Sequence, residues 1–181
     1  MATILHTAAE AVINAPAPIV LAVLRDFDGR HREILPPAFS NLIVEKGGVG
    51  AGTEMSFDLT LGGRTQRARS RVEEPSDGVI EEHIVGRDMV TTFTVRPDGD
   101  RATARIETRW QQASGLAGVL ERVAVPRMLR QIFRDELARL DQVAGSINVE
   151  RTRPRPPDAT GPSTTQGRRA KQARLLFSVA R

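Results

Sequence analysis

The sequence predicts an α+β fold in which a curved antiparallel sheet of about seven strands wraps around one long C-terminal helix. Residues 116–143 carry apolar side chains at three- and four-residue steps, the pattern of one helix face. Much of the chain before them alternates polar and apolar residues between frequent turn signals, which is typical of an antiparallel meander. A helix of this length is roughly 42 Å long, so it needs a whole sheet to bury its apolar face.

Composition favours a single soluble domain with a basic tail. The chain has 181 residues, no cysteine and no apolar run long enough to cross a bilayer, and its N-terminus is a poor secretory signal, so we expect a cytoplasmic protein without a membrane span. Residues 146–181 contain eight of the 26 basic and two of the 22 acidic residues, so they carry +6 and residues 1–145 carry −2. The body therefore gives no reason to expect specific nucleic-acid binding.

The first elements are a strand and two short helices. Residues 6–14 are permissive for a strand, which Pro16 and Pro18 end, and the second proline suits the first turn of a helix. Residues 19–26 and 30–35 then have the apolar spacing and the flanking turn residues of short helices.

Six further strands follow. Gly62-Gly63 is a hairpin turn of the kind that tolerates positive φ, and prolines, glycines and aspartates mark the other turns. The predicted strands cover residues 41–46, 53–61, 64–74, 79–85, 90–96 and 102–110.

The long helix has marked ends and an internal break. Ser114 is placed to cap its start and Gly145 to end it. Pro126 removes a backbone donor and predicts a bend, which divides the helix into a half that gates a cavity and a half that anchors on the sheet. The tail, residues 146–181, is rich in Pro, Arg, Ser, Thr and Gly, and we expect it to be disordered. Residues 1–145 would then form the one folded domain.

Three short stretches resemble the START-like, or SRPBCC, superfamily, and within it the polyketide cyclase/dehydrase-like group. V-I-N-A-P-A-P-I-V (12–20) is similar to the stretch that leads from its first strand into its first helix, G-V-G-A-G-T (48–53) to a strand turn, and V-E-E-P (72–75) to the turn after strand four. The resemblance implies the helix-grip fold (START/Bet v 1-like) with a cavity between sheet and helix. These motifs lie at turns and at connections between elements, so they support the fold better than they support an activity.

Alternation along the strands gives the candidate cavity residues. Large side chains at Phe57 and Leu59 face small ones at Ala68 and Ser70, which would leave a void, although most inward residues simply make core. Trp110 ends the last strand and would close one end of the cavity or pack at the hinge. The ligand-binding candidates are Met55, Phe57, Leu59, Ala68, Ser70, His83, Phe93, Thr108, Trp110, Val119 and Phe133.

The three histidines form no recognisable catalytic or metal-binding pattern. His83 would serve as an acid, a base or a ligand anchor if it faced inward, but Ile80, Glu82 and Ile84 make the bulkier face of its strand, so a surface position is favoured. His6 and His31 have no partner at metal-ligand spacing, so no metal is expected. No motif indicates a cofactor.

Three functions remain open. The leading hypothesis is that the cavity binds a hydrophobic small molecule, a lipid or a polyketide-like compound, in an apolar space of several hundred Å³. A metal-free cyclase or dehydratase would also need polar side chains converging in that space, and the sequence leaves open whether the protein is an enzyme. A protein-interaction module whose basic tail tethers a protein partner is the other alternative.

Overall fold

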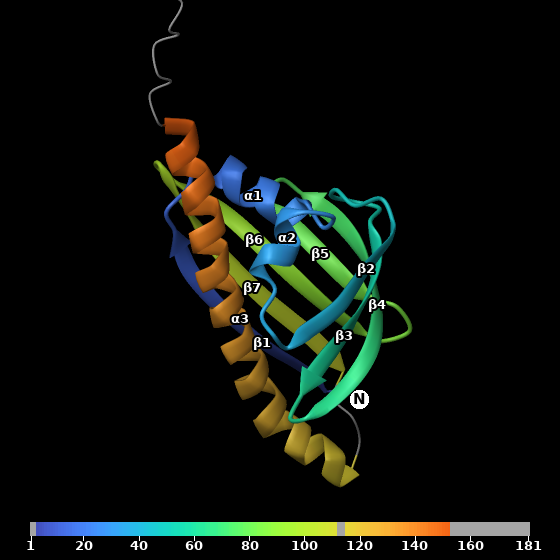
Figure 1. Ribbon diagram of the computed structural model, residues 1–181. Helices are drawn as coiled ribbons and strands as arrows, with labels where there is room; N and C mark the ends of the chain where they lie inside the picture. Colours follow the sequence, from blue (N-terminus) through green and yellow to red (C-terminus); the bar gives the residue numbers. More distant parts are fainter. Residues whose placement is uncertain (1–2, 112–114, 153–181) are drawn as a thin grey trace, which may run out of the picture.

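The computed structural model describes residues 3–111 and 115–152, with side chains for 3–111 and 124–152. Seven strands form one antiparallel sheet in the order β1-β7-β6-β5-β4-β3-β2, and it curves around the long helix α3 (Gly115–Thr152) (Figure 1). The expected fold class is confirmed. The strands are β1 (Ile4–Ile13), β2 (Phe39–Lys46), β3 (Glu54–Leu61), β4 (Arg64–Ser76), β5 (Val79–Ile84), β6 (Met89–Asp98) and β7 (Arg101–Gln111).

Turn chemistry fixes the strand boundaries. Gly62 and Gly63 join β3 to β4 with φ angles of 55° and 77°, which L side chains rarely adopt. Gly78 joins β4 to β5, and a Cβ there would lie 2.6 Å from the carbonyl oxygen of Val95. A side chain would therefore clash with the backbone of β6.

Two short helices cover one end of the sheet (Figure 1). Helix α1 (Ala17–Arg25) follows Pro16 and buries Ile19, Val20, Val23 and Leu24, as its spacing predicts. Helix α2 (Arg30–Ile34) begins after Asp26, whose carboxylate accepts hydrogen bonds from the backbone N–H groups of Gly29 and Arg30 at 3.0 Å each. This contact sets the position of His31 at the start of α2.

Helix α3 packs its apolar face against the concave side of the sheet and against α1 and α2. Its buried side chains in the described part are Leu129, Ile132, Phe133, Glu136, Leu137, Leu140 and Ala144. Pro126 lies inside the helix, and its carbonyl accepts a hydrogen bond from the Thr7 hydroxyl on β1 at 3.2 Å. The predicted cap at Ser114 lies outside the described residues.

The predicted end of the helix at Gly145 is wrong, because α3 continues to Thr152. Ile147, beyond the glycine, packs on the core and favours continuation. On the preceding turn, the Asp141 carboxylate accepts hydrogen bonds from the backbone N–H and the side-chain amide of Asn14, which ties this part of α3 to the end of β1. The rest of the predicted tail, residues 153–181, lies outside the described residues.

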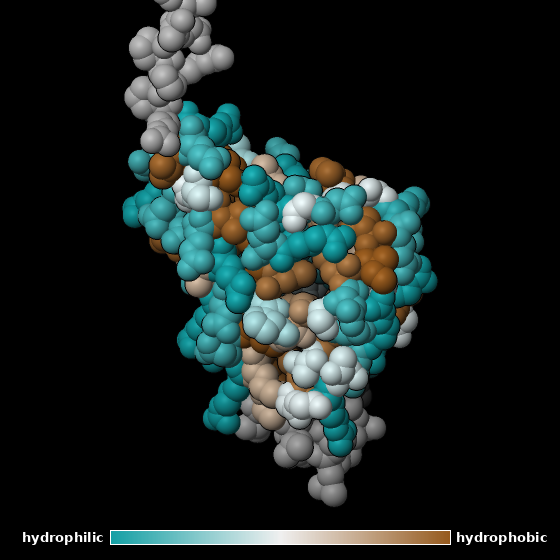
Figure 2. Space-filling view, viewed as in Figure 1, coloured by the Kyte–Doolittle hydropathy of each residue, from teal (hydrophilic) through white to brown (hydrophobic). Residues whose placement is uncertain are grey.

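The face drawn in Figure 2 shows hydrophobic atoms gathered between α3 and β2, surrounded by hydrophilic side chains. Within residues 3–111 and 115–152, no helix is long and apolar enough to cross a bilayer.

Candidate functional site

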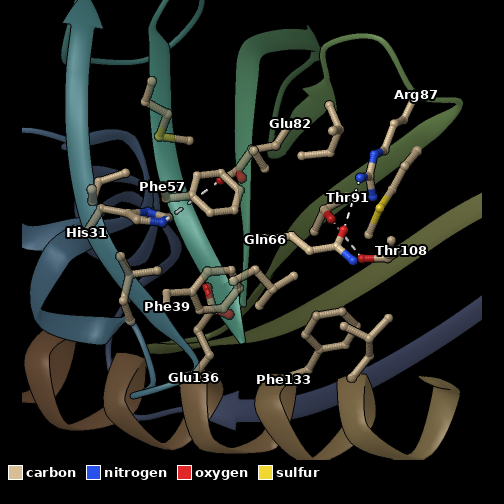
Figure 3. A pocket seen from close by; sticks show the side chains of 18 of the residues that line it. His31, Phe39, Phe57, Gln66, Glu82, Arg87, Thr91, Thr108, Phe133 and Glu136 are labelled. Carbon is tan, nitrogen blue, oxygen red and sulfur yellow. Dashed lines mark hydrogen bonds and ion pairs between the residues drawn. The ribbon is translucent and has the colours of Figure 1, made fainter. Parts of the chain in front are cut away.

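A partly enclosed, mainly apolar space lies between the concave face of the sheet and α3, and we call it the inner hollow. Its volume is about 80 Å³. Figure 3 shows side chains reaching into it from the sheet, from α2 and from α3. The residues that line it are His31, Leu35, Phe39, Leu42, Met55, Phe57, Leu59, Gln66, Arg67, Ala68, Glu82, Ile84, Arg87, Met89, Thr91, Phe93, Thr108, Leu129, Phe133 and Glu136.

A second, more open space adjoins it, which we call the outer hollow. Its volume is about 560 Å³, and it lies at the β3–β4 and β5–β6 turns beside Trp110 and Val125. The hydrogen bond from Arg87 to the Gln66 side-chain oxygen, 3.0 Å long, lies where the two hollows meet. The outer hollow has the size expected from the sequence, and the inner hollow is smaller. Five residues line both hollows: Leu59, Gln66, Arg87, Met89 and Leu129.

Most of the predicted cavity residues face these hollows. Trp110 is 7% exposed and lines the outer hollow. Thr108 donates to or accepts from the Thr91 hydroxyl at 2.7 Å, so its hydroxyl is already hydrogen-bonded. Seven of the predicted residues line the inner hollow: Met55, Phe57, Leu59, Ala68, Phe93, Thr108 and Phe133.

Two predicted residues, His83 and Ser70, line neither hollow, and a third is not described. His83 points to the other face of β5, where its Nε2 lies 3.1 Å from Glu81 and 3.7 Å from Glu73. Its inclusion among the cavity candidates was therefore wrong, and the side that the strand pattern favoured is the one observed. Ser70 is buried in the sheet but lines neither hollow. The side chain of Val119 lies outside the described residues.

The histidine that does reach the inner hollow is His31. Its ring lies 4.5 Å from the Phe27 ring and 6.1 Å from the Phe93 ring, centroid to centroid, and the residue is 2% exposed. Burial lowers the pKa of His31 to about 4, although a hydrogen bond to the Leu24 carbonyl opposes the shift. The Nδ1 atom lies 2.9 Å from that carbonyl and donates to it, so Nε2 is left as an acceptor.

Glu82 lies on β5 with its carboxyl group directed at His31 (Figure 3). Its Oε1 is 3.9 Å from His31 Nε2, too far for a hydrogen bond, and it has no hydrogen-bond partner among the described residues. Burial raises the pKa of Glu82 to about 7. Because His31 is neutral at that pH, the contact is not an ion pair.

Glu136 approaches the same space from α3. The residue is 3% exposed, and burial together with the nearby Glu82 raises its pKa well above the usual range. The lower-lying carboxyl group in Figure 3 belongs to Glu136, which rises from the helix toward the sheet. The raised pKa of Glu136 favours the protonated, neutral form of its carboxyl group. Glu82, with a pKa of about 7, is divided between its two protonation states at neutral pH.

This arrangement brings an acid, a base of near-neutral pKa and a neutral imidazole into one apolar space. Groups of this kind bind polar ligand atoms or transfer protons, because a general acid or base works best when its pKa is close to the ambient pH. Within the described residues no group of His, Asp and Glu side chains has the geometry to hold a metal ion.

Sequence reasoning missed all three groups, although two carried a signal. Glu82 alternates with Ile80 and Ile84 on the bulkier face of its strand, so the pattern itself placed it inward. Glu136 lies one turn from Phe133 and Leu140, on the apolar face of the helix. A charged residue at an inward position was the signal in both cases. His31 had none, because a five-residue helix has too little periodicity.

Comparison with known families agrees with this geometry. The model of the family described as polyketide cyclase / dehydrase and lipid transport matches residues 5–145. The chain belongs to this family. Comparison with curated proteins gave no match. The family and the fold are those of proteins that bind hydrophobic ligands.

Several solved structures have a fold similar to that of this chain. The solution structure of KanY protein (ms6282) is 26% identical with a TM-score of 0.70, over 78% of this chain and 98% of that one. The ZhuI aromatase/cyclase from Streptomyces sp. R1128 is 16% identical with a TM-score of 0.57, over 84% and 98%. A START superfamily protein from Mycobacterium smegmatis is 12% identical with a TM-score of 0.54, over 81% and 98%. At these identities the last two support the helix-grip, START-like fold alone.

Proposed function

We propose that this protein binds a hydrophobic small molecule, of the lipid or polyketide type, with one end in the inner hollow and its body in the outer hollow. The observation that carries the proposal is that the two spaces adjoin each other and share Leu59, Met89 and Leu129 as lining residues. An apolar channel that ends at a few polar groups is the usual form of a small-molecule site. The family match supports the same conclusion.

A substitution that fills the inner hollow tests this proposal. Ala68 lines that space from β4, so Ala68→Leu should occupy it without adding charge. We expect the neutral fluorophore N-phenyl-1-naphthylamine to brighten on binding the wild-type protein and to bind Ala68→Leu at least tenfold more weakly. Ala51→Leu, the same change at an exposed turn residue, is the control. Absence of probe binding to the wild type, or equal binding by all three proteins, would contradict the proposal.

Native mass spectrometry of the purified protein gives an independent measurement. A co-purified compound of a few hundred daltons that is lost on Ala68→Leu would identify the natural ligand class.

A second candidate function, a cyclase- or dehydratase-type enzyme, is favoured by the two buried carboxyl groups. Glu82 as a carboxylate would take a proton from the carbon next to a ketone, while the Glu136 acid donates its proton to the ketone oxygen, giving the enol. The reverse transfer returns the ketone. These two steps are the proton movements that aldol cyclisation and dehydration share.

Hydrogen exchange in deuterated water tests this chemistry without knowledge of the substrate. We expect the wild-type protein to accelerate exchange of the methyl protons of 2-acetonaphthone, followed by NMR, and Glu82→Gln to lose this acceleration. Glu81→Gln, on the opposite face of the same strand, should retain it. Equal rates with wild type and Glu82→Gln would remove Glu82 from any catalytic role.

A protein partner bound through residues 146–181 stays a prediction, since only residues 146–152 of that segment are described. The cytoplasmic location also stays a prediction.

A further inference from the structure

We propose that the polar end of the inner hollow recognises a protonated amine on an otherwise apolar ligand, held between the carboxylates of Glu82 and Glu136. This inference rests on the proposed binding function and specifies the chemical class of the ligand.

The two carboxyl groups enter the hollow from different walls. Glu82 comes from the sheet and Glu136 from the helix, and both line the same space (Figure 3). Glu82 is 9% exposed and Glu136 is 3% exposed, so neither is solvated as a surface glutamate would be. Burying a carboxylate in this way is costly unless a partner is present. Within the described part of the chain, Glu82 Oε1 has no such partner.

The cationic residues that line the inner hollow are engaged elsewhere. The Arg67 guanidinium lies 3.2 Å from Asp58 and donates to the Ser56 hydroxyl at 2.7 Å. Arg87 donates to Gln66 at 3.0 Å. No salt bridge joins either arginine to Glu82 or Glu136 in the described residues, so neither arginine compensates the two carboxyl groups when they ionise, and a cationic ligand would do so.

The acceptor set also fits an ammonium group. An ammonium has three N–H donors and no acceptor. The hollow offers the Glu82 carboxylate, the Glu136 carboxylate and the Nε2 lone pair of His31, whose Nδ1 proton is held by the Leu24 carbonyl. A ligand carboxylate placed between the two glutamates would meet like charge as they ionise, and a hydroxyl group could supply only one donor.

Size limits the group that can occupy this end. A space of about 80 Å³ holds a primary amine with a short length of chain but not a bulky headgroup. The remaining apolar chain would leave between Leu59, Met89 and Leu129 into the outer hollow, past Trp110. Trp110 is the only tryptophan in the chain, so its fluorescence reports the arrival of a ligand.

Binding of a cation would be linked to proton release. The titratable and charged residues facing the hollow are His31, Arg67, Glu82, Arg87 and Glu136, and burial raises the pKa values of the two glutamates. An ammonium between them favours their charged forms, so it displaces protons that they hold at neutral pH. Affinity for an amine should therefore rise with pH from 6 to 8, while affinity for a neutral ligand should not.

The test compares three ligands with the same apolar chain: decylamine, 1-decanol and decanoate. Displacement of N-phenyl-1-naphthylamine and quenching of Trp110 measure their affinities at pH 6, 7 and 8, below the critical micelle concentrations. We expect decylamine to bind at least tenfold more tightly than 1-decanol at pH 8, with a smaller ratio at pH 6. Calorimetry in phosphate and in Tris at pH 7.5 should show net proton release with decylamine only.

Isosteric variants assign the effect to the carboxyl groups. Glu82→Gln and Glu136→Gln should each weaken the binding of decylamine about tenfold and leave the affinity for 1-decanol unchanged. A general loss of folding would be recognised because it weakens the binding of both ligands. Glu81→Gln, whose carboxylate lies beside His83 on the other face of β5, should change neither.

The outcomes separate this inference from the proposed function. Failure of all three ligands and of the naphthylamine probe would contradict both. Equal binding of decylamine and 1-decanol, unchanged in the glutamine variants, would overturn the amine inference and leave hydrophobic binding intact. Tightest binding by decanoate, lost in Arg87→Gln, would assign the site to anionic ligands instead.

Discussion

The two faces of the sheet use the same charged residue types in opposite ways. On the outer face Arg69 pairs with Glu45 and Arg71 with Glu73, each from a side chain that water also reaches. On the inner face Glu82 and Glu136 are buried and no arginine or lysine in the described chain forms a salt bridge with them.

The two groups of charges differ in what they do to the stability of the fold. Exposed ion pairs contribute little and cost little, so they can be lost and regained without consequence for the fold. A buried, unpaired carboxyl group lowers stability, and its presence in an otherwise apolar cavity is best explained by a ligand or a reaction. Three changes test this contrast, beginning with the largest expected effect.

The apolar wall of the cavity should matter most for stability. Phe133 is 3% exposed in the contact between α3 and the sheet, so Phe133→Ala should lower the free energy of unfolding by about 3–5 kcal/mol. The measurement is urea denaturation followed by circular dichroism. Ile43 on the outer face is 53% exposed, and Ile43→Ala should change the free energy by about 0.5 kcal/mol or less. Similar losses in the two variants would remove the distinction between the faces.

The inner carboxyl group should give the next largest effect, and it should depend on pH. The pKa of Glu82 is raised from 4.5 to about 7 in the folded protein. Between these values the folded state holds a proton that the unfolded state has released, so stability falls as pH rises. Glu82→Gln removes this loss and should gain about 3 kcal/mol relative to wild type between pH 4.5 and pH 7.5. Urea denaturation at both pH values measures the difference.

His31 also makes the stability depend on pH, so the experiment has to compare the variant with the wild type at each pH. Its pKa is lowered to about 4, so its contribution changes with the opposite sign, with stability lost as pH falls from 6.5 toward 4. This contribution is present in wild type and in Glu82→Gln, so it cancels in their difference. A difference between the two proteins that does not change with pH would mean that Glu82 is solvated rather than buried.

A partly exposed ion pair should give the smallest effect. Arg25 on α1 donates from Nε at 3.0 Å and from Nη2 at 2.6 Å to Glu74 on β4, and both side chains are partly exposed. Glu74→Gln should cost about 1 kcal/mol or less, with the loss reduced in 1 M salt. Thermal melting at low and high salt measures it. A loss as large as that of Phe133→Ala would show that this pair holds α1 on the sheet.

Patterns that repeat over many residues were predictable from the sequence. Period-two alternation placed Met55, Phe57 and Phe93 on the inner face, and three- and four-residue spacing placed Phe133 on the buried side of α3. These residues are numerous and apolar, so their positions follow from burial alone. The seven strands and their order along the chain follow from the same patterns and from the turn residues between them.

The polar end of the cavity was not predictable in the same way. His31 becomes a cavity residue only because Asp26 holds the start of α2 and Phe27 and Phe93 pack around its ring. Glu82 and Glu136 meet through a contact between a strand and a helix far apart in sequence. His83 attracted attention for its chemistry, whereas the strand pattern favoured its neighbour Glu82. A charged residue at an inward position of a strand or helix is a better guide to a cavity site than a reactive residue type alone.

The pairing of β1 with β7 has a consequence for how the protein folds. All other neighbouring strands are consecutive in the chain, whereas Ile4 and Gln111 are about a hundred residues apart when they pair. Closing so long a loop is slow, because its entropy is lost before the contact is made. We therefore expect the hairpins from β2 to β7 to form first and β1 to join last, together with the helix that Asn14 and Thr7 bind. During synthesis, the first strand to leave the ribosome would wait longest for its partner.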